Sequence, residues 1–214
     1  MIRPPYLQKG DTVAIVSPAK KIAPEEIEIA IDFLEQHGLT VLLGPNVFNS
    51  WNRFSGSDSE RTNDFQWALD SNHVKAIFCA RGGYGSVRII DQINFESLNK
   101  QPKWIVGYSD ITVFHSHINS NYSVMTIHGP MPLNIINRPE ELSSANQLIT
   151  ILFGERQQID FDSHALNQLG KASGKLVGGN LSVLSDLIGT NSDVVTEGSI
   201  LFIEDLCEEN YKLD

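Results

Sequence analysis

Four short apolar runs alternate with segments of helical periodicity along the first half of the chain. The runs cover residues 12–16, 40–43, 74–80 and 104–106. Between them, apolar residues recur three and four positions apart, which is the spacing of one helix face. Alternation of strands and helices favours a parallel sheet with helices packed on its faces. We therefore predict an α/β fold for this part of the chain.

The fourth run leads into the elbow, defined as residues 107–110 with the sequence Gly-Tyr-Ser-Asp. Helical spacing begins directly afterwards, so Ser109 is predicted at the apex of a strand-to-helix turn, beside the unpaired N–H groups of the helix. This is the arrangement of a nucleophile elbow, although Ile111 stands where that motif has its second glycine. Taken alone, a helix cap formed by Ser109 or Asp110 is the commoner explanation of such a stretch.

A second turn, the glycine loop, follows the third run. It covers residues 81–86, with the sequence Arg-Gly-Gly-Tyr-Gly-Ser, and a helix is predicted from Ser86 to about Ile93. Glycines let the backbone approach a ligand closely, and a helix start would present N–H groups to an anion or a developing oxyanion. A sharp turn at a crowded strand end is an equal alternative, and Arg81 favours recognition of a carboxylate.

Two other strand ends carry side chains suited to acid–base chemistry. His128 ends a strand predicted over residues 123–127, and Glu204 ends a buried strand predicted over residues 199–203. A carboxylate in such a place can orient a histidine, as in a Ser-His-Glu triad. Judged one at a time, a structural histidine and an acidic strand cap explain them at least as well.

The character of the chain changes after residue 136. A helix is predicted from Pro139 to Gly154, and polar sequence follows it. Beyond this we predict a strand, a glycine turn at Gly178 and Gly179, and another helix. The predicted units are an N-terminal α/β domain with the nucleophile at 1–136, a linking helix and loop at 137–168, and the start of a second α/β domain at 169–214.

Charge and cysteine content limit the partners that we expect. Among 214 residues, 16 are basic and 26 acidic, and no basic cluster occurs, so we expect no nucleic-acid partner. No apolar run approaches the roughly 20 residues that span a bilayer, and the N-terminus lacks a signal core. We predict a cytoplasmic protein with no membrane partner. Cys79 and Cys207 have no metal-ligand spacing and are expected to be buried free thiols, and no metal or other cofactor is predicted.

Seven short motifs, taken together and in order, resemble the LD-carboxypeptidase family of serine peptidases. They are Val16-Ser17-Pro18-Ala19, Ser55-Gly56-Ser57-Asp58 with Glu60-Arg61, Ala80-Arg81-Gly82-Gly83-Tyr84-Gly85, Gly107-Tyr108-Ser109-Asp110, His128-Gly129-Pro130, Gly178-Gly179-Asn180-Leu181 and Leu201-Phe202-Ile203-Glu204-Asp205. Each is weak alone, but together they extend over essentially the whole chain. The resemblance implies a flavodoxin-like N-terminal domain with the nucleophile and a C-terminal domain with the rest of the triad.

The resemblance also implies individual roles. Ser109 is the nucleophile and Glu204 the triad carboxylate, with Glu208 as the alternative carboxylate. The N–H groups of Gly83 and Asp110 form the oxyanion hole. The substrate-binding residues are Arg81, Gly82 and Tyr84.

The triad histidine is the point where the chain departs from the family. In the family this histidine follows the Glu-Asp motif, and none of the six histidines here matches it. We therefore expect a fragment that lacks its general base and has little activity, with His128 as the only local substitute. A serine whose proton has no acceptor is a poor nucleophile.

The resemblance implies that the substrate is a muropeptide. Ser109 would attack the amide that joins diaminopimelate or lysine to the terminal D-alanine of a tetrapeptide, during cytoplasmic recycling of the cell wall. A self-immunity hydrolase of the microcin C type is an alternative within the family, but its relatives tend to lack the Arg-Gly-Gly-Tyr-Gly form present at residues 81–85. A non-catalytic peptide-binding module is the third possibility. The expected partners are the muropeptide and, in a homodimer, a second copy of the chain.

Overall fold

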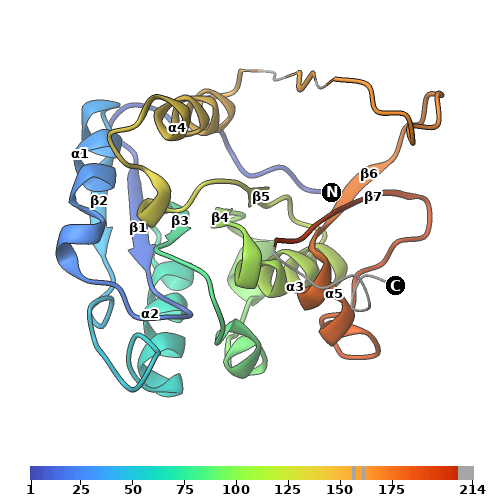
Figure 1. The fold of residues 1–214 in the computed structure, drawn as a ribbon. Helices are drawn as coiled ribbons and strands as arrows, with labels where there is room; N and C mark the ends of the chain where they lie inside the picture. Colours follow the sequence, from blue (N-terminus) through green and yellow to red (C-terminus); the bar gives the residue numbers. More distant parts are fainter. Residues whose placement is uncertain (156–157, 161, 207–214) are drawn as a thin grey trace.

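A five-stranded parallel sheet forms the centre of the molecule (Figure 1). The structure is a computed structural model that describes residues 1–155, 158–160 and 162–206. The strand order is β2-β1-β3-β4-β5, and every neighbouring pair is parallel. The strands are β1 (Thr12–Val16), β2 (Thr40–Leu43), β3 (Val74–Cys79), β4 (Trp104–Gly107) and β5 (Ile127–His128). This is the flavodoxin-like order, so the predicted α/β class is confirmed.

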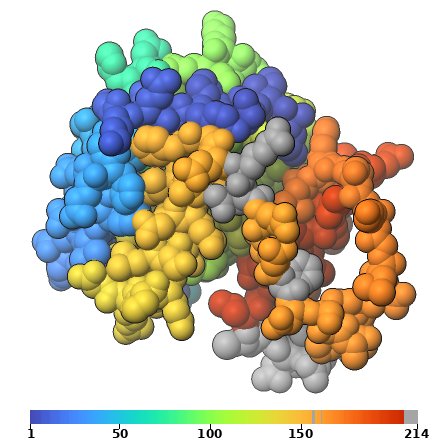
Figure 2. Space-filling view, turned by 90° about the horizontal axis from the view of Figure 1, so that it is seen from above, coloured from blue at the N-terminus to red at the C-terminus, as the bar shows by residue number. Residues whose placement is uncertain are grey.

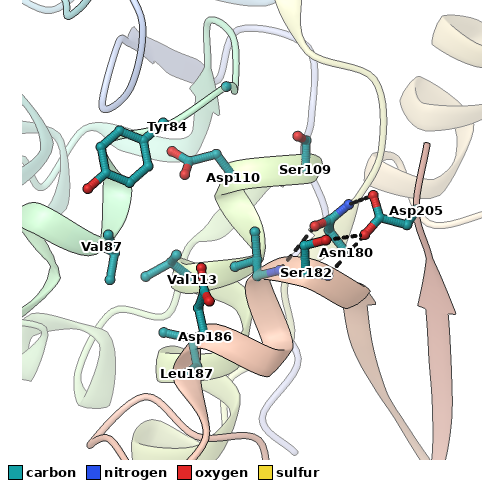
Figure 3. Close-up of a pocket in the computed structure, with 12 residues that line it drawn as sticks. Tyr84, Val87, Ser109, Asp110, Val113, Asn180, Ser182, Asp186, Leu187 and Asp205 are labelled. Carbon is teal, nitrogen blue, oxygen red and sulfur yellow. Dashed lines mark hydrogen bonds between the residues drawn. The ribbon is translucent and has the colours of Figure 1, made fainter. Parts of the chain in front are cut away.

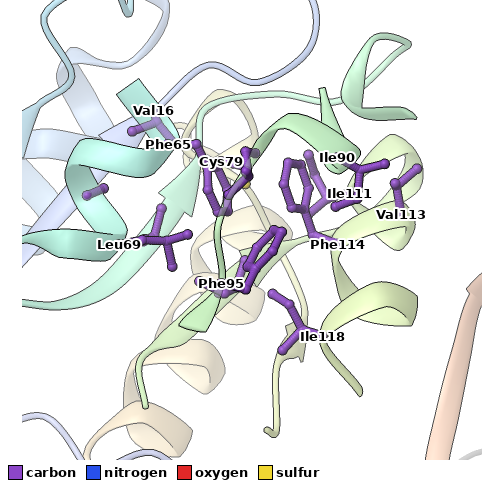
Figure 4. Packing of buried hydrophobic residues seen from close by; sticks show 14 of the residues in the cluster. Val16, Phe65, Leu69, Cys79, Ile90, Phe95, Ile111, Val113, Phe114 and Ile118 are labelled. Atoms are coloured by element: carbon purple, nitrogen blue, oxygen red, sulfur yellow. The ribbon is translucent and has the colours of Figure 1, made fainter. Parts of the chain in front are cut away.

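Helices cover both faces of this sheet. They are α1 (Glu28–Gln36), α2 (Asp58–Asp70), α3 (Thr112–Tyr122) and α4 (Pro139–Leu152). Successive strand residues point to opposite faces, so Val13 and Ile15 pack with α1 and α4 while Ala14 and Val16 pack with α2 and α3. On the second face the rings of Phe65 and Phe114 stack, with centroids 4.3 Å apart (Figure 4). These two cores hold the carboxyl ends of the strands in place.

A second, smaller unit packs against α3. It consists of β6 (Lys175–Asn180), α5 (Leu181–Leu187) and β7 (Ser199–Glu204), and its two strands are parallel. In the space-filling view its orange and red residues form a lobe beside the N-terminal part (Figure 2). The lobe is joined to α3 by polar contacts, including the bonds from Ser116 to the Ser192 carbonyl and from Ser120 to the Asp193 carbonyl.

Two predictions for this second unit are wrong. Gly178 and Gly179 lie inside β6 rather than in a turn, because β7 runs so close that a Cβ on Gly178 would lie 1.8 Å from the Phe202 carbonyl oxygen. The predicted buried strand, β7, is exposed, with Leu201 49% and Ile203 51% accessible. The reason is its position as the outer strand of a two-stranded sheet, because α3 packs against β6.

Two further segments of the N-terminal part also differ from prediction. The helix predicted from Ser86 is replaced by two 3-10 turns, Ser86–Arg88 and Ile90–Gln92, because the chain turns at Ile89 so that both Ile89 and Ile90 are buried. The strand predicted over residues 123–127 is shortened to Ile127–His128, because Val124 forms a bridge with Ile2 instead. In the part of the chain that the structure describes, no helix is both long and apolar enough to cross a membrane.

Candidate active site

Ser109 occupies a strained turn between β4 and α3. Its φ angle is +60°, a left-handed conformation that costs a non-glycine residue energy and is concentrated at functional sites. A 3-10 turn, Ser109–Ile111, connects it to the helix, and neither Ser109 nor Asp110 caps the helix with its side chain. The predicted placement of Ser109 at a strand-to-helix turn is therefore confirmed. The alternative, that the side chain of Ser109 or Asp110 caps the helix, is wrong.

The departure from the elbow motif at Ile111 has a physical explanation. Ile111 is fully buried, and its side chain lies over Gly107 so closely that a Cβ there would be 2.8 Å from Ile111 Cγ1. Gly107 thus makes room for Ile111, and the second glycine of the usual motif is not needed. His115 supports the same turn from α3, since its Nε2 lies 2.8 Å from the Gly107 carbonyl oxygen. Burial lowers the pKa of His115 to about 4, so this ring is neutral and donates to that carbonyl.

The glycine loop faces the elbow. A Cβ on Gly82 would lie 3.3 Å from Ser109 Cβ and 3.5 Å from the Asp110 nitrogen. Gly83 has a φ angle of +115°, a backbone conformation that residues other than glycine rarely adopt. The backbones of the two turns therefore meet beside the Ser109 hydroxyl, and among the described residues none forms a hydrogen bond with that hydroxyl.

A cavity of about 300 Å³ opens beside Ser109, between the N-terminal part and the second lobe (Figure 3). Its lining residues from the first part include Gly83, Tyr84, Ser109, Asp110 and Val113. Those from the second lobe include Asn180, Ser182, Asp186 and Asp205. The cavity is therefore lined by residues that lie far apart in the sequence.

The wall formed by the second lobe is held by Asp205. Its carboxylate accepts hydrogen bonds from Asn180 Nδ2 at 3.0 Å, Ser182 N at 3.0 Å and Ser182 Oγ at 2.6 Å. Burial alone would raise the pKa of Asp205. Hydrogen bonds from Ser182, Leu206 and Asn180 outweigh burial and lower this pKa to about 2. Asp205 is therefore a fully bonded anion, although sequence patterns pointed to its neighbour Glu204.

Glu204 lies at the end of β7 and faces a histidine of the central sheet. Its Oε1 is 3.7 Å from His128 Nε2, and this oxygen is buried without a hydrogen bond from any described residue. Burial and then the charge of Asp205 raise the pKa of Glu204, while burial lowers the pKa of His128. The structure thus brings Glu204 and His128 together, but neither lines the Ser109 cavity.

Arg81 is not among the residues that line this cavity. Its Nη1 donates to the Lys21 carbonyl at 3.1 Å and lies 4.0 Å from Glu26 Oε1. Glu208 and Cys207 lie outside the described residues, whereas Cys79 is a buried free thiol. Within the described part of the chain, no group of three or more acidic, cysteine or histidine side chains is arranged to hold a metal ion.

The glycine loop has a buried support that sequence patterns did not assign. Arg61 is 1% exposed, and its Nη1 donates to the Gly85 carbonyl at 2.9 Å and to the Pro18 carbonyl. Its Nη2 pairs with Asp58. The Asp58-x-x-Arg61 pattern was visible in the sequence. The carbonyl groups of Pro18 and Gly85, which Arg61 contacts, lie far from it along the chain, so the pattern did not reveal them.

Family models match both halves of the chain. The LD-carboxypeptidase N-terminal domain matches residues 13–129, and the LD-carboxypeptidase C-terminal domain matches residues 173–214. The chain belongs to the LD-carboxypeptidase family. A relative from Bacillus subtilis (strain 168), called a probable murein peptide carboxypeptidase, is 40% identical over 99% of this chain and 67% of its own. The murein tetrapeptide carboxypeptidase of Pseudomonas aeruginosa is 31% identical over 94% of this chain and 68% of its own.

Two solved structures have the same fold as this chain. The muramoyltetrapeptide carboxypeptidase from Oxalobacter formigenes superimposes with a TM-score of 0.85 at 28% identity, over 94% of this chain and 68% of its own. The microcin C7 self-immunity protein MccF superimposes with a TM-score of 0.87 over 100% of this chain and 73% of its own. Its sequence identity is only 20%, so this likeness concerns the fold alone.

Proposed function

We propose that this protein is a serine carboxypeptidase that releases the terminal D-alanine of muropeptide tetrapeptides by cleaving an L,D-amide bond. The observation that carries the proposal is the strained Ser109 elbow opposite the backbone of Gly82 and Gly83 at a cavity between two lobes. The murein peptide carboxypeptidases among the relatives supply the class of substrate. A cytoplasmic role in the recycling of cell-wall peptides is part of this proposal.

The reaction would start at the Ser109 hydroxyl. Its oxygen forms a bond to the carbonyl carbon of the amide, and its proton passes to a histidine base. The N–H groups of Asp110 and Gly83 stabilise the resulting oxyanion, a role worth about 3–4 kcal/mol per donor. The C–N bond then breaks, the base protonates the departing D-alanine, and water hydrolyses the acyl-enzyme.

Glu204 would orient that base. Its buried Oε1 accepts no hydrogen bond from the described residues and is therefore available to a ring N–H. We propose that the ring belongs to a histidine of a longer parent chain, beyond residue 214. In this proposal Tyr84 and the backbone of Gly82 and Gly83 hold the substrate near Ser109, and Arg81 contributes to the loop that carries them.

Release of D-alanine from a muropeptide tetrapeptide tests the proposal. We expect the parent to release it, the 214-residue chain to be nearly inactive, and Ser109→Ala in the parent to reduce kcat by at least about 10⁴-fold, as the loss of a nucleophile does. Ser123→Ala is a matched control, since Ser123 has a similar left-handed conformation (φ +53°) at the other end of α3. Retained activity in Ser109→Ala, or cleavage of a peptidyl-nucleotide amide in place of the tetrapeptide, would contradict the proposal.

A further inference from the structure

The side chain of Asp110 connects the elbow to the glycine loop. Its Oδ2 accepts hydrogen bonds from the Ser86 backbone N–H at 3.0 Å and from Ser86 Oγ at 2.7 Å. Both residues are buried, with Asp110 5% and Ser86 0% exposed. One buried carboxylate oxygen therefore joins two turns that are 24 residues apart in the sequence.

This carboxylate has no role in capping the helix. The 3-10 turn at Ser109 and the helix α3 both begin without a side-chain cap. Burial raises the pKa of Asp110, and hydrogen bonds from Ser86 and Gly85 offset only part of this increase. A buried carboxylate costs stability unless it is well bonded, so its placement needs another explanation than local helix formation.

The glycine loop needs such a connection to keep its shape. Gly83 and Gly85 have φ angles of +115° and +139°. Glycine adopts such angles readily because it has no Cβ, but it is also the residue with the greatest conformational freedom. Arg61 holds the loop from behind through the Gly85 carbonyl. Asp110 holds the next residue, Ser86, from the side of the elbow, so the loop is fixed at two adjacent residues directly after Gly83 and Tyr84.

We propose that the Asp110 side chain is a positioning residue that keeps the N–H groups of Gly83 and Asp110 aligned on one oxyanion. The inference rests on the proposed function, because it assigns those two groups to the oxyanion hole. Asp110 thereby acts twice, through its backbone as a donor and through its carboxylate as the tie to Ser86. Misplacing a catalytic group by about 1 Å can cost about 100-fold in rate.

The test uses the parent chain and measures kcat and KM for D-alanine release. We expect Asp110→Ala to lower kcat by about 100-fold with KM within about threefold, and Ser86→Ala, which keeps the backbone donor, to lower it by about 10-fold. Asp110→Asn retains an acceptor oxygen and should recover most of the activity. If Asp110→Ala does not fold, Ser86→Ala and Asp110→Asn still carry the comparison.

Asp64 provides the matched control. It is also buried, at 2% exposed, accepts hydrogen bonds from Asn46 N at 2.9 Å and Asn46 Nδ2 at 2.7 Å, and has its pKa raised by burial. It does not line the Ser109 cavity. Asp64→Ala should therefore reduce thermal stability but leave kcat unchanged. Equal losses of kcat in Asp64→Ala and Asp110→Ala, or wild-type kcat in a folded Asp110→Ala, would overturn the inference.

A second readout separates this inference from the proposed function. A fluorophosphonate reacts with an activated serine whatever the natural substrate, forming an O–P bond as fluoride leaves, and its phosphoryl oxygen occupies the oxyanion hole. We expect Asp110→Ala to slow labelling of Ser109 by the same factor as kcat. Rapid labelling of the wild type without D-alanine release would reject the substrate assignment alone. Unchanged labelling in Asp110→Ala would reject the positioning role alone.

Discussion

The two ends of the candidate active site differ in how their buried carboxylate oxygens are bonded. At the elbow, the Asp110 carboxylate is joined to Ser86, and the Gly107 carbonyl to His115. At the end of β7, the buried Oε1 of Glu204 accepts no hydrogen bond from the described residues, and His128 is 3.7 Å away. The nucleophile side is therefore organised by the residues present, whereas the carboxylate side still has room for a donor.

The same contrast appears in the packing around the two ends. The elbow rests on a core in which Phe114 and Ile111 are fully buried. The strand that carries Glu204 has Phe202 42% exposed and Leu201 49% exposed. A catalytic arrangement needs rigid support on every side, so we expect the elbow to keep its geometry independently and the Glu204 side to depend on further contacts.

The largest expected effect is on turnover. Glu204→Gln in the parent keeps the size of the side chain but removes the charge that would orient and stabilise a protonated base. Such a change in a triad lowers kcat by about 10⁴-fold. Steady-state D-alanine release measures it, with Asp205→Asn as the neighbouring comparison. A loss of less than 10-fold in Glu204→Gln would remove Glu204 from the triad.

A pair of phenylalanine substitutions compares the packing of the two regions directly. Phe114→Ala should reduce the free energy of unfolding of the 214-residue chain by about 3–5 kcal/mol, because a fully buried ring leaves a cavity. Phe202→Ala, in the exposed strand, should cost about 1 kcal/mol or less. Urea unfolding followed by tryptophan fluorescence measures both. Equal losses would contradict the contrast in packing.

The pH dependence of stability tests the support of the elbow by His115. Burial lowers the pKa of His115 to about 4 in the folded chain, against about 6.5 when unfolded. Between these values only the unfolded chain binds the proton, so His115 favours unfolding progressively as the pH falls from 6.5 to 4, by up to about 3 kcal/mol. In His115→Gln that part of the pH dependence should vanish. An unchanged slope of unfolding free energy against pH would show that His115 is not a buried neutral ring.

The smallest effect is expected at His128. If the base is a histidine of the parent chain, His128→Asn should lower kcat by less than about 10-fold, because its ring only neighbours Glu204. The same D-alanine assay as for Glu204→Gln gives the comparison. A loss as large as that of Glu204→Gln would instead make His128 the base.

Local patterns predicted the elbow well, and long-range contacts explain what they missed. An apolar run, Gly107 and helical spacing after Asp110 were enough to place Ser109. The place of Gly178 inside β6 could not be predicted, because it depends on β7, more than 20 residues away. The Asp110–Ser86 bond was hidden for the same reason. The exposure of β7 was not predicted, because an apolar run does not reveal how many strands pair beside it or what packs on its faces.

Trapping the acyl-enzyme tests the role of Ser109 most directly. The parent is mixed with a muropeptide tetrapeptide, quenched in acid within the first turnover, digested and mapped by mass spectrometry. We expect one peptide, containing Ser109, to carry the mass of the tetrapeptide without its D-alanine. That adduct should be absent in Ser109→Ala. Release of D-alanine with no adduct on Ser109, or with the adduct on another residue, would contradict the assignment of Ser109 as the nucleophile.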